Sequence, residues 1–295
     1  MRRATASILF ACACGGAAEP VAVQVPEPAP LPSVSADVSA PPPATIAPHV
    51  RGGGTSVVVS FAEIRKHPEG ARVDGMIRGA PAWRAFPTID PVRDLDWMTE
   101  DGNDMLVRHD VPDAQVDGAI ASVAQPVNLG SGLKAWRGVV NHADVVFLRA
   151  QPHVVRIAPA DHADVAARDL LAHPPSAPTF HAHEAARVRI PDPASHVEGV
   201  PDDITEARVW IDSRPADGGA DIFAEADCPD AAAAQRDAAA IAAFIRARNT
   251  FAVRIVTGGV LNNVEVKPVD RRVAIHLSAS EQQLAAVLSL APSLY

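Results

Sequence analysis

Cysteine is scarce in this chain of 295 residues, which has three, at Cys12, Cys14 and Cys228. So few cysteines exclude a disulfide framework. Aromatic residues make up only 4% of the chain and include a single tyrosine, so the core must be built mainly from small aliphatic side chains. No stretch of the sequence reaches the roughly 18 apolar residues that a membrane-spanning helix needs.

A surplus of basic residues is also missing. The chain has 26 Lys and Arg against 35 Asp and Glu, which gives a formal net charge of −9. This balance gives no footprint of nucleic-acid binding and no polybasic membrane patch. Hydrophobic residues make up 48% and charged residues 21% of the chain, which is ordinary for a globular protein with one large core or two small ones.

The first two cysteines follow a charged start and a short apolar stretch. Two arginines precede the mostly apolar residues 4–11, which is the layout of a secretory signal peptide. The sequence Leu9-Phe10-Ala11-Cys12 resembles the lipobox of bacterial lipoproteins, in which the cysteine is acylated and becomes the mature amino terminus. Phe10 departs from that pattern, because a small residue is usual there, and Cys14 is therefore the alternative attachment site.

A metal or redox role for these two cysteines is the competing interpretation. Two thiolates supply half of the four ligands of a structural zinc site, and the chain has no second cysteine pair to complete it. We therefore interpret residues 1–11 as a signal peptide and residues 12–55 as the lipid-attachment cysteine followed by a Pro/Ala-rich linker. Residues 17–50 contain nine prolines and no Lys or Arg, which predicts a disordered, extended spacer with a reach on the order of 100 Å.

From residue 56 onward the sequence predicts an α+β fold built from two related units, 56–180 and 181–295. Each unit should consist of an antiparallel sheet with helices packed on one face. Both contain a strand that runs into a helix through the same Asp-x-Pro-Asp junction, at residues 110–113 and again at 227–230. Further strand pairs and a second helix recur at the same offset. A hairpin is expected around residues 217–219, where Asp-Gly-Gly favours a tight turn.

Two local predictions concern helix starts. The sequence IDPVRDLDWM predicts a helix that begins at Asp90, with Pro91 in its first position. Ser278 and Glu281 have the spacing of a capping box at the start of the last helix.

Four histidines near the junction of the two units are the densest set of metal-ligand residues. They are His173, His181, His183 and His196. Two histidines separated by one residue share a face when they lie on a strand, so a third ligand could complete a zinc site. We favour no metal site and no cofactor, because this segment is rich in proline and reads as a solvated connector.

Two other groups of residues have a structural explanation. The acidic run from Asp90 to Asp104 lacks the spacing of a calcium-binding loop, since Met98 occupies the third ligand position. Helix capping and solvation explain the run better. Cys228 lies at a predicted helix start, and its counterpart in the first unit is Val111, which indicates a position that needs a small apolar side chain.

The chain resembles a loose group of uncharacterised envelope lipoproteins from myxobacteria and related bacteria. The resemblance is carried by the lipobox-like start, the Pro/Ala spacer, IDPVRDLDWM and the strand followed by DVPDAQVDGAIA, and it extends over most of residues 56–295. It implies a bacterial envelope address and a two-part α+β body. No activity is known for that group, so the resemblance assigns no functional residue.

These observations predict a membrane-anchored protein of the bacterial cell envelope, on the periplasmic or surface side, held by an N-terminal lipid. No catalytic constellation is evident in the sequence, so we expect a non-catalytic module that binds or scaffolds an envelope protein or polymer and no nucleic acid. The alternative is a zinc-dependent envelope protein or hydrolase that uses the histidines between His173 and His196.

Overall fold

The computed structural model describes residues 54–102 and 104–290. The predicted signal peptide, Cys12, Cys14 and nearly all of the Pro/Ala-rich linker lie outside the described residues. Within them, no helix is long and apolar enough to cross a membrane.

Strands and helices alternate along both halves of the chain. The strands of the first half are β1 (Ser56–Ser60), β2 (Leu95–Asp101), β3 (Asp104–His109), β4 (Ala124–Val127), β5 (Ala135–Val140), β6 (Ala143–Gln151) and β7 (Val154–Pro159). Its helices are α1 (Phe61–Ile64), α2 (Gly70–Gly79), α3 (Pro81–Arg84), α4 (Pro91–Asp94), α5 (Asp113–Ala121) and α6 (Ala163–Ala172). The second half contains β8 (Glu184–Pro191), β9 (Glu206–Arg214), β10 (Gly219–Asp227), α7 (Ala231–Arg248), α8 (Phe251–Val256), β11 (Val264–Val269), β12 (Arg272–Ala279) and α9 (Glu281–Leu290).

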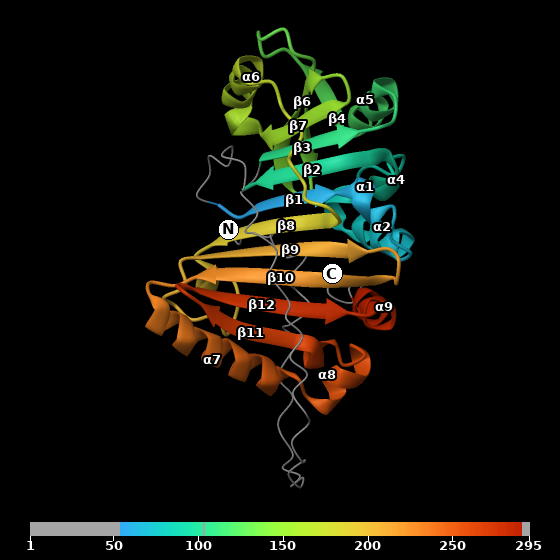
Figure 1. Ribbon diagram of the computed structural model, residues 1–295. Coiled ribbons are helices and arrows are strands. Elements are labelled where there is room, and N and C mark those ends of the chain that lie inside the picture. Colours follow the sequence, from blue (N-terminus) through green and yellow to red (C-terminus); the bar gives the residue numbers. More distant parts are fainter. Residues whose placement is uncertain (1–53, 103, 291–295) are drawn as a thin grey trace, which may run out of the picture.

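All the strands join one antiparallel sheet of 12 strands, in the order β11-β12-β10-β9-β8-β1-β2-β3-β7-β6-β5-β4 (Figure 1). The α+β class is therefore confirmed. The two halves also repeat one arrangement, since β1-β2-β3-β7-β6 has the same order and direction of pairing as β8-β9-β10-β12-β11. The first half adds β5 and β4 at its outer edge. Strands β1 and β8 pair at the centre, where Val57 lies opposite Val188.

Most helices pack on one face of the sheet, as predicted, whereas α6 packs on the opposite face. On β6, Phe147 packs with Ile120 of α5, whereas its neighbours Val146 and Leu148 pack with Leu170 of α6. Successive side chains of a strand point to opposite faces, so α5 and α6 cover opposite faces of the same strands. The strand registers place α1, α2, α4 and α7 on the α5 side.

The helix starts follow the sequence in part. Asp230 caps α7 by accepting a hydrogen bond from the amide of Ala233 at 2.7 Å. The capping box of α9 is shifted by two residues from its predicted place. It joins Ser280 and Gln283, whose amides each donate to the partner's side chain, at 3.0 and 3.4 Å.

The helix predicted from IDPVRDLDWM is shorter than expected. It begins after Asp90 as predicted, but α4 ends at Asp94, and Leu95 already belongs to β2. The alternating residues that follow pair with β1 on one side and β3 on the other, and this pairing outweighs helix continuation.

Candidate functional site

The four connector histidines do not meet at one point. His173 lies 3.2 Å from Asp169, and His183 lies 3.4 Å from Glu63. Within residues 54–102 and 104–290, these histidines belong to no group of three ligand atoms close enough to hold one metal ion. Each of the two instead has a local acidic partner.

His181 is the best-fixed of these histidines. Its Nδ1 lies 2.8 Å from a carboxylate oxygen of Glu184, and its Nε2 lies 2.7 Å from Asp212 of β9. Glu184 is fully buried and also forms an ion pair with Arg187 at 3.2 Å. Both ring nitrogens of His181 are thus engaged, and the ring joins the connector to the start of β8 and to the last residues of β9.

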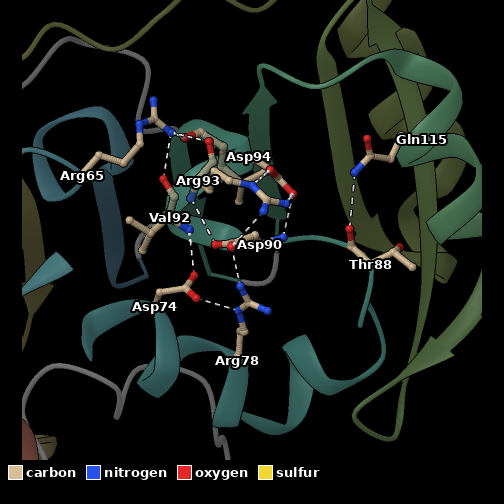
Figure 2. Close-up of polar contacts among 10 residues, drawn as sticks. Arg65, Asp74, Arg78, Thr88, Asp90, Val92, Arg93, Asp94 and Gln115 are labelled. Atoms are coloured by element: carbon tan, nitrogen blue, oxygen red, sulfur yellow. Dashed lines mark hydrogen bonds and ion pairs between the residues drawn. The ribbon is translucent and has the colours of Figure 1, made fainter. Parts of the chain in front are cut away.

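The acidic run that begins at Asp90 is a capping and ion-pair network around α4 (Figure 2). Asp90 accepts a hydrogen bond from the amide of Arg93 at 3.2 Å and pairs with Arg78 of α2. Asp94, which is almost fully buried, accepts from the amide of Asp90 at 2.8 Å. Asp74 of α2 accepts from the amide of Val92 at 3.1 Å. The capping role predicted for this run agrees with the contacts of Asp90 and Asp94, whereas the later acidic residues, from Asp96 to Asp104, belong to strands β2 and β3.

The opposite end of α4 is held by one arginine. The Arg65 guanidinium donates to the carbonyl oxygens of Val92, Arg93 and Leu95 at 2.8, 2.9 and 2.6 Å (Figure 2). These carbonyls are the unsatisfied acceptors at a helix end, so Arg65 takes the place of a further helical turn. A positive charge also suits the negative end of the helix.

A second cluster, which the sequence did not single out, lies at the end of β3. His109, Asp113 and His153 offer ligand atoms that all lie within 4.8 Å of one another, the one such group in the described part of the chain. The buried His109 ring donates from Nδ1 to the carbonyl of Val111 at 2.9 Å, and its Nε2 accepts from Arg149 at 2.8 Å. Burial lowers the pKa of His109, which favours this neutral form.

Arg149 already contacts two of these three ligand residues, His109 and Asp113. Its guanidinium lies 3.0 Å from Asp113 and also pairs with Asp117, which in turn lies 2.5 Å from Lys134. A fixed positive charge next to the His109 Nε2 lone pair opposes the binding of a cation. We therefore interpret the cluster as a structural link between β3, α5 and β6.

Glu100 has an unusual environment for a carboxylate. On β2 it lies between Val57 of β1 and Met105 of β3, its neighbours in the strand register. Burial raises the pKa of Glu100 to about 7. The side chain is accordingly partly protonated near neutral pH.

A surface rich in charged side chains lies on the second half of the sheet, on the face opposite α7. We call it the charged face and define it by Arg208, Trp210 and Asp212 of β9, Asp221, Phe223 and Glu225 of β10, and Arg272 and His276 of β12. The strand registers place all of these side chains on one side, whereas Ala226 and Val273 point to α7.

Aromatic rings form the middle row of the charged face, in which Trp210 is buried and Phe223 and His276 are partly exposed. Phe223 stacks on Trp210 at a centroid distance of 5.7 Å and on His276 at 4.6 Å. With a ring stacked on both of its faces, Phe223 offers only its edge to a ligand. The row therefore serves as an apolar centre and offers no flat platform on which a sugar ring could stack.

Ion pairs flank this aromatic row. On one side Arg208 and Arg272 lie 3.9 and 2.8 Å from the Glu225 carboxylate. On the other side Asp221 pairs with His276 at 3.1 Å and with Arg214 at 3.5 Å. Positive and negative groups thus alternate across the strands around an aromatic centre.

Cys228 packs in the core, as its position in the repeat predicted. It lies under α7 with Ala233 and Val273, and the thiol is buried. Burial, and then a hydrogen bond with Asp237, raise the pKa of Cys228 to about 12. The thiol therefore stays protonated and unreactive at neutral pH.

The fold defines an α+β protein with one continuous antiparallel sheet. No family model and no curated protein matches the chain. Two crystal structures of TP0453 are similar in fold. Form I has a TM-score of 0.47 and covers 85% of this chain and 99% of that one, and form IV has a TM-score of 0.49 and covers 83% and 98%. Both are 11% identical to this chain, and at this level no property of TP0453 transfers to it.

Proposed function

We propose that this is a lipid-anchored bacterial envelope protein whose folded part is a non-catalytic binding module for another envelope protein. The observation that carries the binding role is the charged face. It combines the partly exposed rings of Phe223 and His276, which lie beside the buried Trp210, with a border of ion-paired arginines and carboxylates. Protein interfaces share this anatomy, in which aromatic residues and arginine gather at the centre and polar groups form the rim.

The anchor is proposed from the sequence. A cysteine at position 12, or alternatively at position 14, follows an arginine pair and an apolar stretch and precedes a proline-rich segment. Acylation with more than one chain would give stable attachment, because each buried methylene contributes about 0.8 kcal/mol. The segment between the anchor and β1 would hold the folded part away from the membrane.

The anchor is tested by replacing both cysteines. The double variant Cys12→Ala/Cys14→Ala should leave the membrane fraction of the producing cells and lose incorporation of labelled fatty acid. The single variants then identify the acylated residue. Retention of labelled fatty acid by the double variant contradicts the anchor, and Cys228→Ala is the matched control that should change neither result.

The binding role is tested by photo-crosslinking in intact cells. A photoreactive amino acid at Arg272, on the rim of the charged face, should yield a discrete crosslinked protein. The same residue at Arg236, which is exposed on α7, serves as the control and should not. Crosslinking to a cell-wall polymer, or equal products from both positions, contradicts a protein partner at this face.

A further inference from the structure

Helix α8 exposes an unusual amount of apolar side chain. Phe251 is 72% exposed, Ile255 is 64% exposed and Val256 is 48% exposed. Phe251 and Ile255 are four residues apart, so they lie on the same side of the helix. Single exposed hydrophobic residues are ordinary, but a group of them on one short element marks a contact surface.

Helix α8 is capped at both ends by its flanking threonines. Thr250 caps the helix by accepting from the amide of Val253 at 3.3 Å, and Thr257, which is buried, donates from its hydroxyl to the Val253 carbonyl at 2.7 Å. The helix lies at one end of the molecule, beyond the C-terminal end of α7 and beside α9 (Figure 1). Its apolar side chains are therefore held outward at a corner of the protein.

Two exposed arginines lie close to this apolar group in the sequence, Arg254 on α8 itself and Arg246 five residues before Phe251. Arg246, in the last turn of α7, and Arg254 of α8 are exposed, and their guanidinium groups make no ion pair or side-chain hydrogen bond with any described residue. Arg248 differs, because it pairs with Glu198 at 2.7 Å. The corner therefore offers two free positive charges next to exposed apolar side chains.

We propose that this corner contacts the surface of a lipid bilayer that contains anionic headgroups. Phe251, Ile255 and Val256 enter the boundary between headgroups and acyl chains, while Arg246 and Arg254 lie at the phosphates. Amphipathic helices that bind the membrane interface have this arrangement, with apolar residues on one side and basic residues at its border.

A second copy of the chain is a poorer occupant. A stable interface buries about 800 Å² on each partner, and three side chains of a six-residue helix cover only a fraction of that area. The free arginines would also face each other in a symmetric pair. A bilayer needs no matching shape and supplies the negative charge.

The test uses the full chain with Cys12→Ala/Cys14→Ala, so that acylation cannot contribute to membrane binding. Its sedimentation is measured with vesicles of phosphatidylcholine, alone and mixed with phosphatidylglycerol. We expect binding to the mixed vesicles, reduced about tenfold by Phe251→Ser/Ile255→Ser. Arg246→Gln/Arg254→Gln should reduce binding about tenfold as well and remove the preference for anionic lipid.

The control is Val165→Ser/Leu171→Ser on α6, where the two side chains are 60% and 55% exposed. This variant should bind as strongly as its parent, and all variants should unfold at the same temperature because the replaced side chains are exposed. Binding unchanged by Phe251→Ser/Ile255→Ser overturns the proposal. A parent that does not bind vesicles, or that forms a dimer dissolved by this double replacement, overturns it too. None of these outcomes depends on the lipid anchor, so the two proposals fail separately.

Discussion

At the scale of single residues, the two halves use equivalent positions differently. Asp230 caps α7, whereas Asp113 at the matching junction is turned toward Arg149 and accepts from the amide of His153 at 3.0 Å. The repeated motif thus predicted the start of a helix in both halves. It could not reveal that Asp113 pairs with Arg149, because Arg149 belongs to β6 and lies far from the motif in the sequence.

Glu100 makes the stability of the protein depend on pH. Its pKa is raised from 4.5 to about 7, so the folded state binds a proton more tightly than the unfolded chain does. The proton-linked stability is full below about pH 4.5 and is lost as the pH rises toward 7. Glu100→Gln should therefore increase the free energy of unfolding at pH 8 by about 3 kcal/mol, with a smaller gain at pH 5, as measured by urea denaturation.

The control for this measurement is Glu198→Gln. Glu198 is exposed and pairs with Arg248 at the surface, where an ion pair contributes little. Equal effects of the two replacements at pH 8, or a gain from Glu100→Gln that grows toward acidic pH, would contradict the assigned role of burial.

At the scale of elements, local signals located helix starts better than helix ends. Asp90 and Pro91 marked the beginning of α4, but its end at Asp94 depends on pairing of β2 with two other strands. The capping box of α9 was placed two residues early because Ser278 and Ser280 both precede an acidic or amide residue by three positions. Ser278 belongs to β12, where it lies opposite Asp221.

The cap of α7 provides a test at this scale. Asp230→Ala removes the acceptor for the Ala233 amide, and loss of such a cap costs about 1 kcal/mol. For a protein of this size we expect the midpoint of thermal unfolding to fall by about 2–4 °C. Asp161→Ala, at an exposed position before α6, is the control and should leave the midpoint unchanged; an equal fall in both variants would argue against the cap.

At the scale of the whole molecule, the sequence predicted the class, the repeat and the hairpin at Asp217-Gly218, where Gly218 has a φ of +69°. It did not predict that both halves join one sheet, because the pairing of β1 with β8 has no local signal. The charged face was hidden for a related reason. Successive side chains of β9 point to opposite faces of the sheet. The sequence does not show which of the two faces is covered by α7 and which carries the charged face.

Joining of the halves through β1 and β8 can be tested with separate chains. Residues 54–180 and 181–295, produced together, should associate into one soluble complex, because each supplies the strand that the other lacks. Either piece alone should aggregate. Co-purification and size-exclusion chromatography give the readout, and two pieces that remain soluble monomers would show that the units are independent domains.

The central place of β1 also shapes the order of folding. Val57 is among the first described residues, yet its partner Val188 lies 131 residues further along the chain. Pairing between strands that are far apart in the sequence raises the contact order, and a high contact order slows folding. Until β8 is synthesised, the free edge of β1 is unpaired and exposed. A chaperone that binds unfolded chains could protect this edge.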